Sequence, residues 1–245
     1  MKQKKGGARN MKNQAFLSVL FLVLLCLAIC HAESAVVPAT IAVGDVVSLG
    51  NYEQDGDNDN GQEPIEWVVL DVQGDKALLL SRHILDAKPY NVDEVDITWE
   101  QCTLRAWLNS EFLDAAFSEE EQSVILITDV DNSLAQGQYG TFGGNDTQDK
   151  IFLLSYYEAH DMYFTDDESR KCGATWYASS RGAATRNNII VDDLYACPWW
   201  LRTPWLYQID VSAVNFGGTM AGGYCTDSGL GVRPAIWINL NADVF

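Results

Sequence analysis

The chain has few of the residues on which common catalytic and nucleic-acid-binding sites depend. Among its 245 residues are only three histidines, one of them (His31) near the N-terminus, so a metal centre built from several histidines is not expected. No G-x-S-x-G or C-x-x-C motif occurs, which argues against a serine-hydrolase elbow and against thioredoxin-like redox chemistry. The two remaining histidines do not suggest a catalytic base. His83 follows a predicted strand, and His160 is adjacent to Asp161, a spacing at which two side chains do not face each other on a helix.

Basic residues are also scarce, and they are unevenly distributed. The chain holds 16 Lys and Arg against 34 Asp and Glu. Residues 1–32 contain five of the basic residues and none of the acidic ones, so residues 33–245 carry 11 basic and 34 acidic residues, a net charge of −23. Nucleic acid and anionic membranes attract positively charged proteins. We therefore expect no nucleic-acid partner, whereas cationic and neutral partners remain open.

The N-terminus has the layout of a secretory signal peptide. A basic stretch precedes the apolar run 15–30, which is shorter than the ~20 residues of a membrane span. Small residues around His31 place cleavage after Ala32, with an uncleaved anchor or a lipoprotein at Cys30 as alternatives. We expect an exported protein, secreted or at the cell surface, without a membrane span after cleavage and monomeric. The division expected is a signal peptide over 1–32, a leader over 33–42 and a single domain over 43–245.

Four cysteines remain after signal cleavage, an even number in an exported chain. Such a number permits disulfides, although small buried thiols that fill core space are the alternative. Cys102 lies in a helical pattern and is expected to be a buried free thiol. The candidates for one disulfide are Cys172, Cys197 and Cys225.

Hydrophobic patterning predicts strands near both ends and helices between them. Residues 43–49 and 65–72 flank an acidic turn and predict a hairpin, and 76–81 a third strand. Residues 99–117 have helical spacing, and Ser118 is a predicted helix N-cap. Residues 128–149 are polar and predict a surface excursion. Three further strands, expected over 199–203, 209–216 and 232–240, are separated by glycine turns at 217–218, 222–223 and 229–231. No βαβ alternation occurs, so the fold class is α+β, a single domain with a mainly antiparallel sheet and early and middle helices.

Five strings in a fixed order resemble a bacterial exported domain family of unknown function. The resemblance covers about residues 43–240, and it implies a C-type-lectin-like fold similar to that of the formylglycine-generating enzyme group. In that group a W-L-R-like strand and a terminal G-[FV]-R strand lie in the core of the sheet. The strings are EPIEW at 63–67, TWEQCTLRAWLN at 98–109, DKIFLLS at 149–155, WWLRTP at 199–204 and GVRPAIW at 231–237.

The formylglycine-generating group also suggests an enzyme, but this chain departs from its pattern. Those enzymes oxidise substrates with closely spaced cysteines beside an R-x-R-rich strand. Here Cys197 and Cys225 are 28 residues apart, without such a cluster. An exported enzyme, or enzyme relative, that uses one of these late cysteines therefore stays the alternative function.

The acidic turn between the first two predicted strands is the strongest local pattern for a metal. Alternate carboxylates in a tight turn can surround calcium, and Glu66 is twelfth from Asp55, as in an EF-hand loop. The glycine comes seventh instead of sixth, and the flanks predict strands, so a solvated acidic turn is the alternative. The candidate ligands are Asp55, Asp57, Asp59 and Glu66; no other cofactor is expected.

Eight tryptophans and ten tyrosines supply aromatic faces of the kind that exported binding modules use for sugars or peptides. Most of the tryptophans fall on predicted strand or helix faces and are expected in the core, and Arg202 and Arg233 are expected to have structural roles there. The favoured function is a noncatalytic binding module for a glycan, a peptide or a surface partner. The candidate ligand-binding residues, all in turns or polar stretches, are Trp205, Tyr207, Tyr224 and Tyr139.

Overall fold

A five-stranded antiparallel sheet is built from both ends of the domain. In the computed structural model, which describes residues 41–242, its strand order is β1-β2-β3-β14-β7. The strands are β1 (Val46–Tyr52), β2 (Glu63–Gln73), β3 (Lys76–Ser81), β7 (Ile151–Phe152) and β14 (Ala235–Asn239). In β2, Ile65, Trp67 and Val69 are buried while the residues between them are half-exposed, the alternation of a strand with one covered face. The predicted hairpin and third strand are thus confirmed.

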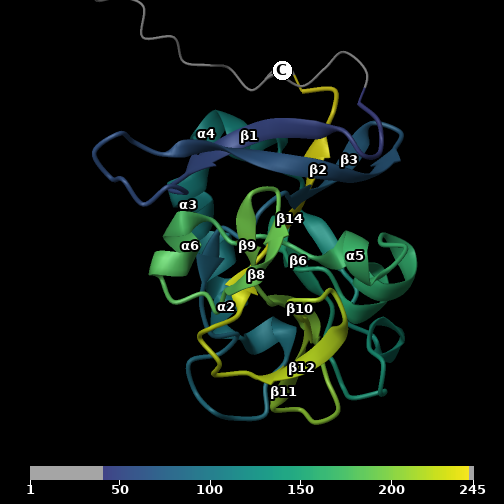
Figure 1. Ribbon diagram of the computed structural model, residues 1–245. Coiled ribbons are helices and arrows are strands. Elements are labelled where there is room, and N and C mark those ends of the chain that lie inside the picture. The colour runs from purple at the N-terminus through teal and green to yellow at the C-terminus, as the bar shows by residue number, and fades with distance from the viewer. Residues whose placement is uncertain (1–40, 243–245) are drawn as a thin grey trace, which may run out of the picture. The chain divides into compact units, whose positions relative to one another are not determined.

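The second five-stranded sheet has the order β12-β11-β10-β13-β4. Figure 1 shows β11 and β12 at the end of the domain opposite β1 and β2. All pairings in this second sheet are antiparallel except that of β10 with β13. Its strands are β4 (Asp86–Ala87), β10 (Trp199–Pro204), β11 (Asp210–Val214), β12 (Met220–Tyr224) and β13 (Gly231–Val232). Two strand pairs complete the β-structure: β5 (Thr128–Val130) with β6 (Thr147–Asp149), and β8 (Arg186–Val191) with β9 (Leu194–Ala196).

The helices are short, and the predicted helical segment over residues 99–117 is confirmed. It consists of η1 (Trp99–Gln101), α2 (Thr103–Trp107), the π-helical turn η2 (Leu108–Phe112) and α3 (Leu113–Ala116). Ser118 caps α4 (Glu119–Val124) in a capping box with Glu121, as its sequence position predicts. The other helical turns are η3 (Leu134–Gln136), η4 (Glu158–Met162), α5 (Asp167–Arg170) and α6 (Trp176–Ser180). The described residues therefore form one α+β domain dominated by antiparallel sheets.

Two predictions from the sequence are wrong in part. The excursion over 128–149 is not wholly at the surface, because its two ends pair as β5 and β6 and bury Val130 and Asp149. Gly222 and Gly223 do not form a turn but lie within β12, paired with β11. A Cβ atom at Gly222 would lie 2.2 Å from Cδ1 of Trp205, so the absence of a side chain is needed for packing.

The predicted signal peptide, 1–32, and the leader, 33–42, lie outside the described residues except for positions 41 and 42. Within residues 41–242, no helix has the length and apolar character needed to cross a membrane.

Candidate functional site

The acidic turn between β1 and β2 brings three carboxylates together. One oxygen each from Glu53, Asp55 and Glu63 lies within 4.8 Å of the other two. Backbone donors fix all three side chains: Gly56 N is 2.7 Å from Glu53 Oε1, Gln54 N is 2.7 Å from Glu63 Oε2, and Asp57 N is 2.7 Å from Asp55 Oδ1. The hydrogen bond from Asp57 N, followed by that from Asn60, lowers the pKa of Asp55. Oxygen ligands of this kind suit a hard cation.

The remaining carboxylates of the predicted calcium site do not join this group. Asp57 and Asp59 are exposed, and Asp57 Oδ1 accepts a hydrogen bond from Asp59 N at 3.1 Å. Glu66 is turned away from the loop, because its Oε2 is 2.9 Å from Nη1 of Arg82. The ligand set expected from the sequence lacked Glu53, which directly follows β1, and Glu63, which begins β2.

The predicted ligand-binding aromatic residues come together at one end of the second sheet. The rings of Tyr139 and Trp205 form an edge-to-face pair with centroids 4.8 Å apart. Tyr207 lies in the turn that joins β10 to β11, where its carbonyl accepts from Asp210 N at 3.0 Å. Tyr224 ends β12 directly opposite Asp210. We call this region the end surface; its members are Tyr139, Phe142, Trp205, Leu206, Tyr207 and Tyr224.

Hydrogen bonds between loops hold the end surface together. Thr141 Oγ1 donates to the carbonyl of Trp205 at 2.7 Å, and Gln208 Nε2 donates to the carbonyl of Phe142 at 2.7 Å. Gln208 also exchanges two hydrogen bonds with Ile97. Three segments distant in the sequence are thereby fixed against one another, so the aromatic residues are presented by tied loops.

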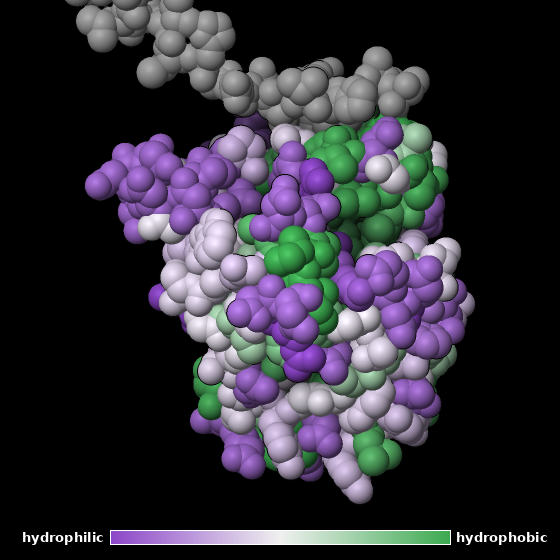
Figure 2. Space-filling model, viewed as in Figure 1, coloured by the Kyte–Doolittle hydropathy of each residue, from purple (hydrophilic) through white to green (hydrophobic). Residues whose placement is uncertain are grey.

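Several large apolar side chains of the end surface face solvent. The exposed fractions are 64% for Tyr207, 63% for Tyr224 and 61% for Phe142. In Figure 2, single hydrophobic side chains stand among hydrophilic ones at the lower end of the molecule, the end at which Figure 1 shows β11 and β12. This end of the molecule thus presents apolar and polar residues side by side, an arrangement suited to a ligand with both kinds of surface.

Behind Trp205 lies a second aromatic pair that the sequence did not assign to the site. Tyr156 is 6.0 Å from Trp205 and stacks on His160 at 5.1 Å. His160 Nδ1 is 2.9 Å from Asp161 Oδ1, so the expectation that these neighbours do not meet is wrong. Both lie exposed in the π-helical turn η4, where the imidazole folds back onto the next carboxylate. Burial, followed by the charge of Asp161, raises the pKa of Tyr156.

Arg202, buried in β10, binds two of the segments that support the end surface. Its Nη2 is 2.9 Å from Glu158 Oε1 and also donates to the carbonyl of Asp131 at 2.9 Å. Its neighbour Thr203 accepts from Tyr156 N at 3.1 Å. The structural role expected for this buried arginine is therefore to hold η4 and the 131–136 segment against β10.

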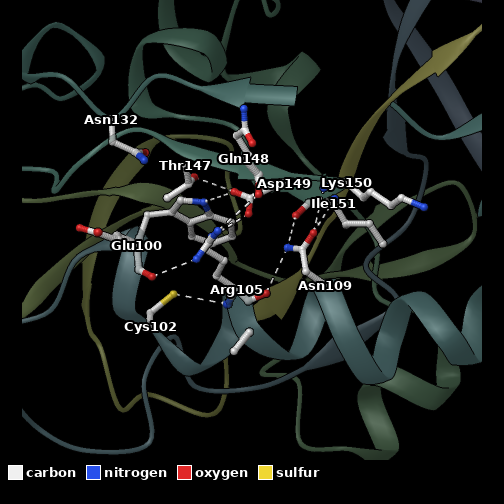
Figure 3. A network of polar contacts seen from close by, with 12 residues as sticks. Glu100, Cys102, Arg105, Asn109, Asn132, Thr147, Gln148, Asp149, Lys150 and Ile151 are labelled. Atoms are coloured by element: carbon white, nitrogen blue, oxygen red, sulfur yellow. Dashed lines mark hydrogen bonds and ion pairs between the residues drawn. The ribbon is translucent and has the colours of Figure 1, made fainter. Parts of the chain in front are cut away.

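A second polar network explains two of the strings quoted above (Figure 3). Buried Asp149 accepts hydrogen bonds from Trp99 Nε1 at 2.9 Å and Arg105 Nε at 2.7 Å. Asn109 Oδ1 accepts from the backbone N–H groups of Lys150 and Ile151 at 2.9 and 3.1 Å. These residues join the helical segment to β6 and β7, so their role is architectural.

The four cysteines among residues 41–242 are separate buried thiols, so the bridge predicted among the last three is not formed in this structure. Cys172 and Cys197 do lie opposite each other, with Cys197 N donating to the Cys172 carbonyl at 3.0 Å. Burial raises the pKa of Cys102 to about 12 and also raises the pKa values of Cys197 and Cys225. A thiol is the poorly nucleophilic form of cysteine.

The chain matches the model of one known protein family. The model of the family described as "Domain of unknown function (DUF6273)" matches residues 74–240. The chain belongs to this family. No curated protein and no solved structure matches it.

The extent of the match separates the two candidate sites. All six residues of the end surface lie within residues 74–240, together with both strings that form the network of Figure 3. The acidic turn precedes residue 74 and lies outside the match. The end surface is therefore part of the region that matches DUF6273, and the carboxylate group lies N-terminal to that region.

Proposed function

We propose that this DUF6273 protein is an exported, noncatalytic binding module that holds its ligand on the end surface. The observation that carries the proposal is the edge-to-face pair of Tyr139 and Trp205, with exposed Tyr207 beside it, on loops tied by side-chain hydrogen bonds. Aromatic rings on ordered loops offer a large contact area at a small entropic cost, since few rotamers are lost on binding. A glycan, a peptide or a surface partner could use such a site.

The C-type-lectin-like architecture belongs to this proposal. Its support is the position of two strings: Trp199, at the start of the W-W-L-R strand, pairs in parallel with Gly231, at the start of the G-V-R string. Both strands are completely buried. The resemblance to the formylglycine-generating group implies such a placement.

The state of the cysteine thiols supports the noncatalytic part of the proposal. An enzyme that uses Cys197 or Cys225 would need an accessible thiolate, whereas both side chains are buried and burial raises both pKa values. The structure thus gives the alternative function no activated nucleophile at either cysteine.

Glycan and peptide arrays probed with residues 33–245 test the function. Tyr207→Ala should weaken any specific signal at least roughly tenfold without affecting folding, because the ring is mostly exposed. Trp176→Ala is the matched control, since Trp176 is 56% exposed and lies on α6. Array signals that both variants reduce equally, or that Tyr207→Ala leaves intact, would contradict the proposal.

A calcium site in the acidic turn is a second, independent proposal. It is favoured by the convergence of Glu53, Asp55 and Glu63, three carboxylates whose mutual repulsion a divalent cation would relieve. In contrast to the sequence pattern, the ligands proposed here include Glu63 and not Glu66. Calcium would stabilise the β1–β2 turn.

A further inference from the structure

From the end surface and its surroundings, we infer that the ligand is a peptide segment bearing Lys or Arg side chains. The inference rests on the proposed binding function and adds the chemical class of the ligand. The cationic groups would lie against the carboxylates of the segment 93–96, and the neighbouring apolar atoms of the peptide against Tyr207 and Tyr224.

The charge distribution around the end surface is one-sided. Three segments contribute the loops at this end: residues 89–104, 131–149 and 203–232. They contain nine acidic residues and no Lys or Arg at all, although the chain has 16 basic residues. One of the nine, Asp149, is buried and paired with Arg105. Among residues 41–242, none of the other eight forms an ion pair, although Lys88, Arg105, Lys150, Arg202 and Arg233 directly flank the three segments.

The acidic segment 93–96 lies beside the aromatic residues. Cys225 Sγ contacts the carbonyls of Asp93 and Val95 at 3.6 and 3.7 Å, and Asn91 N donates to the carbonyl of Cys225 at 2.8 Å. Cys225 directly follows Tyr224 in the chain. Asp210, which lies directly opposite Tyr224 in the β11–β12 pair, adds a further carboxylate next to the same residue.

The carboxylates of this segment are free to pair with a ligand. Asp93, Glu94 and Asp96 are exposed, and among residues 41–242 none of them forms an ion pair. Val92 and Val95 in the same segment are also exposed. Acidic and apolar groups thus alternate along one loop, beside exposed tyrosine rings.

A cationic peptide complements the charge of this surface better than a neutral sugar does. A guanidinium or ammonium group relieves the repulsion among the carboxylates and is also attracted to the face of an aromatic ring. A neutral glycan could stack on the tyrosines, but it would leave the unpaired carboxylates uncompensated. Charge complementarity therefore selects the basic peptide.

The test uses a fluorescent peptide in which four arginines are spaced by Gly-Ser, and a matched peptide with citrulline at the four positions. Citrulline keeps the shape and most of the hydrogen-bonding groups of arginine but has no charge. Residues 33–245 should bind the arginine peptide at least roughly tenfold more tightly than the citrulline peptide. The affinity should fall as salt rises from 50 to 300 mM, since exposed charges are screened beyond about 10 Å at 0.1 M.

Two triple variants with the same change in net charge locate the site. The first variant combines Asp93→Asn, Glu94→Gln and Asp96→Asn. Its affinity for the arginine peptide should be at least roughly tenfold lower than that of the wild type. The control combines Asp57→Asn, Asp59→Asn and Asp75→Asn, three exposed carboxylates in the turns before and after β2. These turns join strands that Figure 1 shows at the end of the domain away from β11 and β12, so this control should retain the wild-type affinity.

Distinct results overturn the inference and the proposed function. Equal binding of both peptides, or equal losses in the two triple variants, would overturn the basic-peptide ligand. If a neutral glycan then binds and Tyr207→Ala abolishes that binding, the binding module stands while the inferred ligand class fails. If binding of the arginine peptide depends on the 93–96 variant but not on Tyr207→Ala, the inferred charge complementarity stands and the aromatic binding site fails.

Discussion

Arg105 Nε lies 2.7 Å from Oδ1 of Asp149, and this ion pair joins a helix to a strand 44 residues further along the chain. The carboxylate is fully buried, while the arginine side chain is one-quarter exposed. Asp149 also accepts a hydrogen bond from Trp99 Nε1 at 2.9 Å and one from Thr147 Oγ1 at 2.7 Å. One carboxylate therefore anchors two donors from the helical segment and one from its own strand.

Replacing Asp149 should destabilise the protein severely. Asp149→Ala leaves the guanidinium of Arg105 and the indole N–H of Trp99 without their acceptor, and loss of one partner of a buried pair costs about 3–5 kcal/mol. Urea unfolding would measure the change in the free energy of unfolding. Asp129→Ala is the control, because Asp129 is exposed and, among residues 41–242, its carboxylate accepts a hydrogen bond from Gln148 alone. Its effect should stay within about 0.5 kcal/mol. Similar losses in both variants would show that the network is not stabilising.

His83 should make the protein less stable as the pH falls below neutrality. Burial, followed by the charge of Arg82, lowers the pKa of this half-buried imidazole, and its Nδ1 has no hydrogen-bond partner among the described residues. In the unfolded chain a histidine binds a proton near pH 6.5, and in the folded protein only at lower pH. Between those two pKa values the unfolded state holds more protons, so the free energy of unfolding rises with pH.

The measurement is the difference in the free energy of unfolding between pH 7 and pH 5. In His83→Gln this difference should be smaller than in the wild type, because the titrating group is gone. Tyr207→Ala, which changes an exposed ring at the end surface, should keep the wild-type difference. An unchanged difference in His83→Gln would contradict the assignment.

The thiols should react slowly with iodoacetamide in the folded protein near neutral pH. All four are buried, and burial raises the pKa of each, so the thiolate population is small. After unfolding without reductant, four thiols should be counted in residues 33–245. A count of two thiols would show that the other two cysteines form a disulfide, as the sequence predicted. A single fast-reacting thiol at Cys197 or Cys225 would favour the enzyme alternative.

Local patterns predicted much of the fold. The third strand begins and ends at the predicted residues, Lys76 and Ser81, because a continuous apolar run between turns has few alternatives. Ser118 was found as a helix cap from the acidic residues behind it. The turn predicted at Gly222 was wrong, because a glycine that the packing of Trp205 requires cannot be told from a turn glycine in the sequence.

The candidate site was predicted only in part, since sequence spacing does not report which loops meet. Tyr139 and Trp205 were both selected as surface aromatics, but their contact joins loops 66 residues apart. Tyr156 and His160 were missed because they approach Trp205 from a third segment. In the acidic turn, counting positions favoured Glu66, whereas Arg82 from the neighbouring strand end holds that carboxylate away.

Calcium should stabilise the folded protein through the acidic turn. If Glu53, Asp55 and Glu63 bind the ion, the free energy of unfolding gains about 2.7 kcal/mol at a hundredfold excess of calcium over Kd. For a domain of this size, that gain corresponds to a rise in Tm of roughly 5–10 °C. Matched magnesium and sodium chloride should give a smaller rise, because they act on exposed carboxylates mainly by screening.

Two glutamate variants decide which residues hold the ion. Glu63→Gln keeps an oxygen that can accept from Gln54 N but removes the charge, so the calcium-dependent rise in Tm should largely disappear. Glu66→Gln removes a charge of the same kind from a side chain that pairs with Arg82 outside the group, so it should keep the full rise. The reverse pattern would restore the EF-hand-like ligand set read from the sequence. An equal response to all three salts would instead identify the turn as a solvated acidic loop, because screening does not distinguish calcium from other ions at equal ionic strength.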